Sequence, residues 1–430
     1  MLAHFERHLS DLIAARWSEE WETAARAAIV EAGGLAAKLP RRARRSLGIF
    51  PTPPRLAKAA GRKLSGIVGA GECVADPTVG LGDLLLPLLA SFRPESDFAD
   101  TIEKASDQFC GHDIRPDLVQ LARLRLLLAT RLRFFQHEPV SRTLVRSAFR
   151  RITVRQVNAN SPLDLSWKHI ILNPPFNQTQ YPRNLAWSSG RGTIAATIAM
   201  LSLEHVALNT KGMLSAILPE SLRSGPRYRA WRETVQSLPL ELTEAPTSRL
   251  PFSGEADIHV YILQAAAGHG HQPSRQSELK SGSLGRAYEV RIGPVVPHRD
   301  PTRGHDALEL DSRMLAARAK GITLSAKAAA TLPKKRRLSR IFQGPILVIP
   351  RTSRPEQRPR LRAVVVSSRE GFHIENHLIV VSSGRTASLR HLARYLRSDK
   401  VSSWMNRRSR LRHISATILR QLPLAPRNAD

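Results

Sequence analysis

The apolar positions of the first 38 residues recur at the spacing of an α-helix. Leu9, Leu12, Ile13 and Trp17 fall at helical intervals, so we predict helical structure over residues 1–38. Residues 40–45 then interrupt the pattern with the basic sequence Pro-Arg-Arg-Ala-Arg-Arg. We therefore expect a short helical N-terminal arm, residues 1–45, ahead of the first large domain.

From this break to about residue 265, short apolar runs alternate with helical patterns. The runs predict strands at residues 73–75, 108–112, 152–154, 169–172, 213–218 and 258–263. Helices are predicted at residues 83–91 and 194–208, and Pro116 opens another at the first helical position, where proline is favoured. The inner face of that helix is expected to be Leu118, Leu121, Ala122 and Leu128. The alternation indicates an α/β domain over residues 46–266, with a mostly parallel twisted sheet covered on both faces.

The pattern changes near residue 265. A stretch rich in Gly, His and Pro (residues 268–274) is typical of a linker. Beyond it, β-like runs at residues 288–292, 346–349, 363–366 and 378–381 are separated by loops rich in Arg and Pro, and residues 388–420 are helical in pattern. We expect a C-terminal α+β domain, residues 275–430.

The charge of the chain narrows its possible partners. The 430 residues carry a formal net charge of +29, which favours a polyanion, either nucleic acid or an anionic membrane surface. No apolar run reaches the roughly 18–20 residues that span a bilayer, and the N-terminus lacks the features of a signal peptide. Cys73 and Cys110 lie beside predicted strands and are interpreted as small core residues rather than a disulfide or metal ligands. We expect a cytoplasmic protein with no metal site and no membrane association.

The first predicted strand runs into a glycine-rich turn, Asp76-Pro77-Thr78-Val79-Gly80-Leu81-Gly82-Asp83. Glycine at such a turn lets a ligand approach the backbone, and a following helix would present free N–H groups. A tight strand–helix turn without a ligand is the alternative. The position after the first strand of an open α/β sheet, where nucleotides bind, favours the ligand site.

Two further sequences end predicted strands. Asp113 follows the second strand and could accept both hydroxyls of a ribose, or it could serve only as an acidic residue at the start of a helix. Asn173-Pro174-Pro175-Phe176 follows the fourth strand. The prolines stiffen the turn. The Asn173 amide oxygen and the Pro174 carbonyl can then accept both hydrogens of one planar NH2 group, with the ring of Phe176 as a stacking face. The alternative is an ordinary proline-rich turn.

Together these sequences resemble class I S-adenosylmethionine-dependent methyltransferases, specifically the DNA N6-adenine group of restriction–modification systems. Residues 76–85 resemble the family's first cofactor motif, and Phe50-Pro51-Thr52-Pro53 resembles its N-terminal cofactor motif. Residues 173–176 match the catalytic motif. The resemblance covers residues 45–265 and implies a Rossmann-like methyltransferase domain followed by a target-recognition domain.

The resemblance implies a role for each matching residue. The catalytic residues would be Asn173, Pro174, Pro175 and Phe176. The S-adenosylmethionine site would include Phe50, Thr52, Pro53, Asp76, Pro77, Thr78, Gly80, Gly82, Asp83, Asp113, Ile114, Asn160, Ser161 and Asn173. Two positions depart from the family, since it usually has Asp where this chain has Asn160, and often has Asp where this chain has Lys168.

The expected partner is double-stranded DNA. Its phosphates would be contacted by Arg336, Arg337, Arg407, Arg408, Arg410 and Arg412, although any single basic run could equally be a solvated face. The sequence has no Gly-x-x-x-x-Gly-Lys-Ser/Thr loop, and its arm is too short for a nuclease domain, so any restriction endonuclease or specificity subunit would be a separate chain. A solitary or phage-defence methyltransferase is equally compatible with the sequence. The alternatives are methylation of RNA (guanine N2 or adenine N6) or of a protein glutamine, and a catalytically silent DNA-binding subunit.

Overall fold

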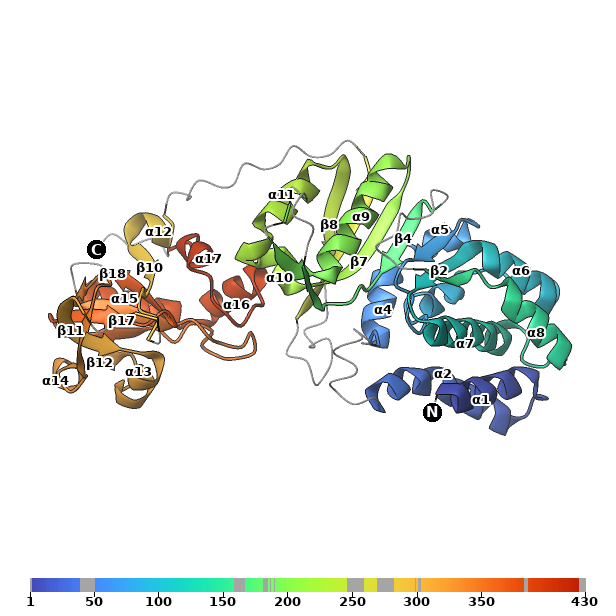
Figure 1. Cartoon of the computed structure of the whole chain (residues 1–430), viewed down its shortest axis with the longest axis horizontal. Helices are drawn as coiled ribbons and strands as arrows, with labels where there is room; N and C mark the ends of the chain where they lie inside the picture. The colour runs from blue at the N-terminus through green and yellow to red at the C-terminus, as the bar shows by residue number, and fades with distance from the viewer. Residues whose placement is uncertain are drawn as a thin grey trace. The chain divides into compact units, whose positions relative to one another are not determined.

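The computed structural model describes residues 2–38, 51–157, 167–180, 185, 187–188, 190–245, 259–268, 282–297, 299–300, 303–382 and 386–424. The chain forms two compact units, Met1–Pro273 and Ser274–Asp430, and the change of build near residue 265 precedes this division (Figure 1).

The first unit is organised around a sheet that has seven strands within the described ranges. Their order is β3 (Val154–Gln156), β2 (Phe109–Asp113), β1 (Val74–Asp76), β4 (His169–Leu172), β7 (Met213–Pro219), β9 (Val260–Ala267) and β8 (Leu240–Ala245). The first five are parallel, and β9 runs antiparallel to both of its neighbours. The mostly parallel sheet and its predicted strands are confirmed, except that the strand predicted at residues 152–154 shares only Val154 with β3. Strand β8 was not predicted, because only Leu240 at its start is buried.

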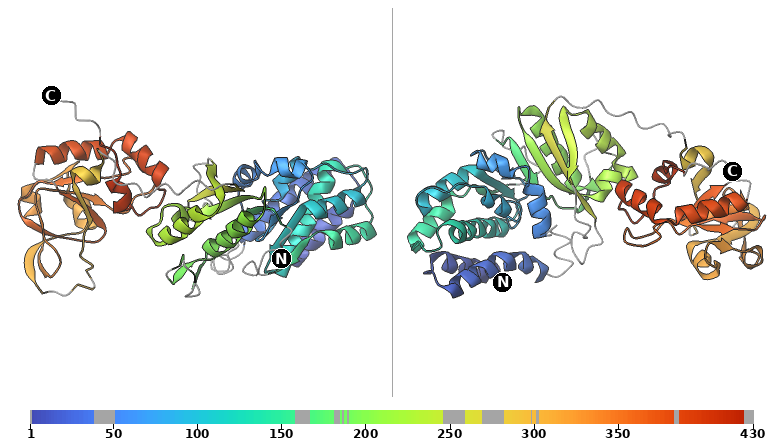
Figure 2. Two further views of the ribbon diagram at one scale, coloured as in Figure 1. Left: turned by 90° about the horizontal axis from the view of Figure 1, so that it is seen from above. Right: turned by 180° about the vertical axis from the view of Figure 1, so that it is seen from behind.

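Alternate side chains of the central strands enter two different cores. Ile171 of β4 and Ile217 of β7 belong to one cluster, whereas Ile170 and Leu172 belong to the other. This two-residue period shows that both faces of the sheet are covered (Figure 2).

The helices divide between these two clusters. The first cluster is covered by α1 (Leu2–Ala14), α2 (Glu19–Lys38), α4 (Pro54–Gly61), α5 (Ser65–Gly69), η1 (Leu86–Ala90), α6 (Phe98–Gln108), α7 (Pro116–Phe134) and α8 (Arg142–Arg151). The second is covered by α9 (Ile194–Leu208), α10 (Glu220–Ser224), η2 (Pro226–Tyr228) and α11 (Arg229–Ser237). The helices at Pro116 and at residues 194–208 are confirmed, and the expected inner face of α7 is buried.

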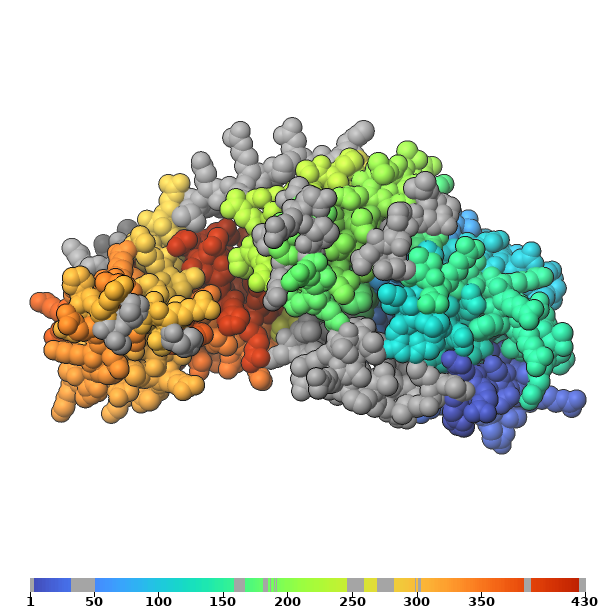
Figure 3. Space-filling view, viewed as in Figure 1, coloured from blue at the N-terminus to red at the C-terminus, as the bar shows by residue number. Residues whose placement is uncertain are grey.

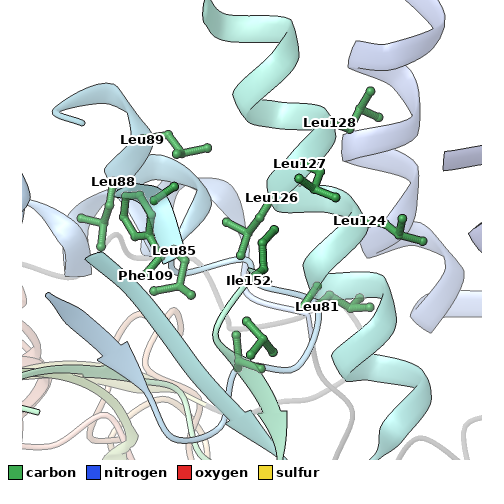
Figure 4. Packing of buried hydrophobic residues seen from close by; sticks show 14 of the residues in the cluster. Leu81, Leu85, Leu88, Leu89, Phe109, Leu124, Leu126, Leu127, Leu128 and Ile152 are labelled. Atoms are coloured by element: carbon green, nitrogen blue, oxygen red, sulfur yellow. The ribbon is translucent and has the colours of Figure 1, made fainter. Parts of the chain in front are cut away.

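The helix predicted at residues 83–91 is wrong. The chain there forms turns and then the short 3-10 helix η1, with Pro87 in its first turn. Proline lacks the N–H that an α-helix would need at this position, and Gly82 has a φ of +80° that ends any helical path before it. The apolar residues of this segment are nevertheless buried, and Leu85, Leu88 and Leu89 lie near Phe109 of β2 in Figure 4.

The N-terminal helices share the first core rather than standing apart from it. Leu9, Leu12 and Ile13 are buried in the same cluster as α7, and the space-filling view shows the blue helices against the rest of the first unit (Figure 3). Arg131 of α7 is buried and donates to the Leu12, Ile13 and Ala15 carbonyls, so it caps the end of α1. Trp17 was expected on the apolar side of a helix, but it follows the end of α1 and is 41% exposed.

The second unit has three layers in its described part. A five-stranded sheet has the order β10 (Glu289–Ile292), β18 (Leu378–Ser382), β15 (Ile346–Pro350), β16 (Val364–Val366) and β12 (Thr323–Leu324). A four-stranded sheet has the order β13 (Lys334–Arg337), β11 (His305–Leu310), β17 (Gly371–Ile374) and β14 (Phe342–Gln343). The helices are α12 (Leu284–Ala287), α13 (Ser312–Arg318), α14 (Ala326–Ala329), α15 (Thr386–Leu396), α16 (Asp399–Arg408) and α17 (Ala416–Arg420).

Alternation along β15 explains this layering. Ile346 and Val348 pack toward the four-stranded sheet, whereas Leu347 and Ile349 pack in the cluster of α15, α16 and α17. The α+β build expected for this part of the chain is confirmed.

Candidate cofactor and acceptor site

Three of the expected functional sequences meet at one edge of the first sheet. Asp76 ends β1, Asp113 ends β2 and Asn173 follows β4, and these three strands are parallel neighbours. Strand β1 lies between β2 and β4. The strands that follow β1 in the sequence are added first on one side of it, as β2 and β3, and then on the other side, as β4 and β7. Open α/β sheets bind ligands outside the carboxyl ends of their strands at such a point.

The turn after β1 is built around Asp76. The buried carboxylate accepts hydrogen bonds from the Thr78 backbone N–H at 2.8 Å and from the Thr78 hydroxyl at 3.2 Å, both at Oδ1. Gly80 follows with a φ of +52°, a conformation that favours glycine. A Cβ atom on Gly80 would meet nothing closer than the Thr78 carbonyl oxygen at 3.9 Å, so the space beside this turn is open.

Burial changes the acidity of both carboxylates at this edge. It raises the pKa of Asp76 to about 7, and the two hydrogen bonds from Thr78 only partly oppose this. Burial also raises the pKa of Asp113, again against hydrogen bonds that favour its charged form. A cation bound here would favour ionisation of both groups, which suits a ligand with a positive charge.

Asp113 holds the glycine turn as well as ending β2. Its Oδ2 accepts the Gly80 N–H at 3.0 Å, and its Oδ1 accepts the Arg115 N–H at 2.9 Å. Each carboxylate oxygen has two lone pairs, so Asp113 retains acceptor capacity for a hydroxyl. The neighbouring Ile114 is 61% exposed and offers an apolar surface beside it.

The proline-rich turn after β4 is fixed from both ends. The amide Nδ2 of Asn173 donates a 2.8 Å hydrogen bond to Oγ1 of Thr52. Phe176 is partly buried and packs against the cores on both faces of the sheet. The chain then forms an unpredicted antiparallel hairpin of β5 (Gln178–Gln180) and β6 (Arg191–Thr193), which leads into α9. Pro174 is buried and Pro175 is half-buried.

A buried arginine that we did not predict completes this region. The backbone N–H of Thr52 donates to Oδ2 of Asp83 at 2.9 Å, and the other oxygen of Asp83 accepts from Arg125 at 2.9 Å. Arg125 lies four residues after Leu121 and three after Ala122, so helical spacing places it on the inner face expected for α7, and it is 3% exposed. Pro53 precedes α4 and ends the extended segment that carries Thr52.

Three expected cofactor residues, Phe50, Asn160 and Ser161, lie outside the described residues. In the described part of the chain, no group of three or more His, Cys, Asp or Glu side chains could hold a metal ion. No helix there is long and apolar enough to cross a membrane. The Cys73 thiol, just ahead of β1, donates a 3.2 Å hydrogen bond to the Cys110 sulfur of β2.

The arginines expected at DNA differ in their surroundings. Arg337 is 4% exposed and donates to Glu309 at 2.9 Å and to the Asp300 carbonyl at 2.8 Å, so its expected place on a DNA-binding surface is wrong. Arg337 is the one buried residue of β13, whereas Lys334, Lys335 and Arg336 are exposed. Arg408 lies over the Trp404 ring at 5.3 Å. Arg407 and Arg408 occupy the last turn of α16, and Arg410 and Arg412 follow it.

No family model matches the sequence, and no curated protein matches it. Among solved structures, the chain is similar to the type IIL restriction-modification enzyme MmeI in complex with DNA, with 14% identity and a TM-score of 0.50 over 90% of this chain and 69% of that one. The chain shares its fold with MmeI. It also matches the type IIG restriction endonuclease BpuSI, with 14% identity and a TM-score of 0.44 over 92% of this chain and 61% of that one. The EcoKI M protein of a type I restriction enzyme matches with 16% identity and a TM-score of 0.34, over 60% of this chain and 56% of that chain.

The MmeI-like fold agrees with the Rossmann-like sheet and the additional C-terminal unit seen here. The chain spans less than two thirds of the BpuSI chain, and about two thirds of MmeI.

Proposed function

We propose that this chain is an S-adenosylmethionine-dependent DNA methyltransferase of the restriction–modification type, which methylates the exocyclic N6 amino group of adenine. The observation that carries the proposal is the hydrogen bond from Asn173 Nδ2 to Thr52 Oγ1. With its nitrogen engaged by Thr52, the amide presents its oxygen as an acceptor at the edge of the sheet where Asp76 and Asp113 also lie.

The residues at this edge fit the methyl donor. The open space beside Gly80 leaves room for a ligand against the backbone, and Asp76 is a buried carboxylate suited to an ammonium group. Asp113 retains lone pairs for ribose hydroxyls, and Ile114 offers a surface for a flat ring. The donor, when bound, supplies an electrophilic methyl group on a sulfonium, which is a good leaving group.

The chain's own residues would then act on the acceptor. Asn173 Oδ1 and the Pro174 carbonyl would accept the two hydrogens of the amino group, and the ring of Phe176 would stack on the base. This arrangement turns the nitrogen lone pair toward the methyl group, and alignment of the two reactants supplies much of the rate. The adenine would have to leave the helix stack, since its N6 group is not reachable within a duplex.

The presence of two separate units supports separate roles in methyl transfer and in DNA recognition. The second unit has two hydrophobic clusters of its own and carries Arg407, Arg408, Arg410 and Arg412. We propose that it contacts DNA and selects the sequence. MmeI, whose fold is similar, was solved in complex with DNA.

The test is transfer of a labelled methyl group to DNA by the purified chain and by its Asn173→Ala variant. Digestion of the product to nucleosides identifies the base. The same assay is run with RNA and with protein as acceptors. If the label appears instead in N6-methyladenosine or N2-methylguanosine of RNA, or in protein, the acceptor is one of these alternatives and not DNA. Cofactor binding without transfer to any of these would favour a silent DNA-binding subunit.

A further inference from the structure

In the structure the Asn173 amide meets the Thr52 hydroxyl through its nitrogen, which leaves its oxygen to face a substrate. An Asn side chain has an oxygen that only accepts hydrogen bonds and a nitrogen that only donates them. Thr52 Oγ1 accepts from the nitrogen at 2.8 Å, although the two residues are 121 positions apart in the sequence. If the Asn173 side chain rotated so that its oxygen and nitrogen exchanged places, its NH2 group would face the amino hydrogens of the substrate. Two donor groups would then face each other, and they would repel.

Thr52 is itself held in place. Its side chain is buried, with 8% of the residue exposed, and its backbone N–H donates to Oδ2 of Asp83 at 2.9 Å. Asp83 belongs to the glycine-rich turn after β1, so this bond joins that turn to the segment ahead of α4.

The second oxygen of Asp83 is held by Arg125. The distance from Asp83 Oδ1 to Arg125 Nη1 is 2.9 Å, and the arginine side chain is 4% exposed. Arg125 Nη1 also donates to the Leu81 carbonyl of the same turn, and its Nη2 donates to the Ile29 carbonyl of α2 at 2.7 Å. A planar guanidinium with fixed donor directions can hold these three acceptors at once.

From this continuous path we infer that Thr52, Asp83 and Arg125 form a positioning relay for Asn173. The relay keeps the Asn173 oxygen available to the acceptor amino group, and through Ile29 it makes the N-terminal helix α2 part of the site's support. Both oxygens of Asp83 serve this relay, as do the N–H and the hydroxyl of Thr52, which assigns the two residues positioning roles in place of the direct cofactor contacts expected from the sequence. The inference rests on the proposed function for its chemical consequence, whereas the geometry of the relay can be tested without it.

The test compares Thr52→Val, which removes only the hydroxyl, with Thr52→Ser, which keeps it. In the full chain, selective 15N labelling of asparagine reports the Asn173 side-chain NH2 signals, which are assigned by their loss in Asn173→Ala. We expect the bonded hydrogen to exchange slowly in the wild type and in Thr52→Ser, and at least about tenfold faster in Thr52→Val, since one hydrogen bond is lost. Equal exchange in Thr52→Val and the wild type would overturn the relay, whatever the chain methylates.

The kinetic part uses the same variants. With saturating cofactor and DNA, we expect Thr52→Val to lower kcat by about tenfold to a hundredfold and to change KM for DNA less than about threefold, because the loss concerns alignment in the transition state. Thr52→Ser should restore kcat. Asp83→Asn should also lower kcat, and the double variant should be no worse than Thr52→Val, because residues in one relay are not additive.

These outcomes separate the two proposals. A loss of kcat with cofactor affinity unchanged by calorimetry supports the relay, whereas additive losses in the double variant contradict it. If the wild type methylates no adenine but the Asn173 exchange depends on Thr52 as expected, the proposed function fails and the relay stands.

Discussion

The Gly80 backbone N–H donates a 3.0 Å hydrogen bond to Oδ2 of Asp113, which lies 33 residues later at the end of the neighbouring strand. One carboxylate therefore fixes the turn after β1 and ends β2. A ligand that contacts Asp113 would meet a turn whose shape that same residue maintains.

We predict that Asp113→Ala weakens the binding of S-adenosylmethionine by at least about tenfold, because it removes both a hydroxyl acceptor and the support for Gly80. Gly80→Val should weaken it similarly, since the side chain enters the open space beside the turn and the φ of +52° disfavours a β-branched residue. Calorimetry with the purified chain measures both affinities. Asp107→Asn, at an exposed position ahead of β2, is the matched control. Unchanged affinity in both site variants would place the cofactor elsewhere.

A second prediction concerns pH. Asp76 has a pKa raised to about 7 by burial, against an ordinary value of 3.8. As pH rises, Asp76 loses its proton at about pH 4 in the unfolded chain but only at about pH 7 in the folded chain. Between these values the folded chain binds more protons, so the contribution of Asp76 to the free energy of unfolding falls as pH rises.

Asp76→Asn has no proton to release and keeps an acceptor for Thr78. Without cofactor, its stability relative to the wild type should be higher at pH 8 than at pH 5, by about 1–3 kcal/mol, because the wild type pays more of the cost of the buried charge at the higher pH. It should also bind cofactor less well, because the negative charge is gone. Thermal unfolding of both proteins at the two pH values checks this. A stability difference that does not change with pH would contradict the role given to burial of this carboxylate.

Local signals in the sequence predicted the strands, the glycine turn and the helix that begins at Pro116, since each depends on residues close together in the chain. The 3-10 geometry after the turn was missed because its leucines have helical spacing and only Pro87 argues against a helix. The Thr52–Asn173 and Asp83–Arg125 bonds join residues 121 and 42 positions apart, so no periodicity indicates them. The burial of Arg337 could not be predicted either, because it depends on pairing with Glu309 of the neighbouring strand β11, which lies 28 residues earlier in the sequence.

A third prediction separates these two neighbouring arginines. Arg337→Ala leaves the carboxylate of Glu309, with a side chain only 12% exposed, without its partner, and should lower the free energy of unfolding by about 3 kcal/mol. Arg336→Ala, with a side chain 64% exposed, should change stability by less than about 0.5 kcal/mol. Chemical denaturation of both variants measures the difference. Equal stability of the two would mean that the Arg337–Glu309 pair adds nothing to the second unit.

A fourth prediction concerns the second unit. A fragment that ends at Pro273 should retain cofactor binding, because the strands that carry Asp76, Asp113 and Asn173 all lie in the first unit. It should lose sequence-selective DNA binding. In the full chain, changing Arg407, Arg408, Arg410 and Arg412 to Gln should reduce affinity for all DNA sequences and flatten the salt dependence, without changing the methylated motif. A fragment that methylates the same site as the full chain would place recognition in the first unit or in another subunit.

Sequencing of single DNA molecules shows whether adenine in DNA is methylated and whether the methylation depends on Asn173. DNA is taken from cells that express the full chain, its Asn173→Ala variant or neither. We predict N6-methyladenine at one sequence motif with the wild-type chain and none with the variant, in cells that also hold any required specificity subunit. Modification that persists with Asn173→Ala, or a modified base other than adenine, would contradict it.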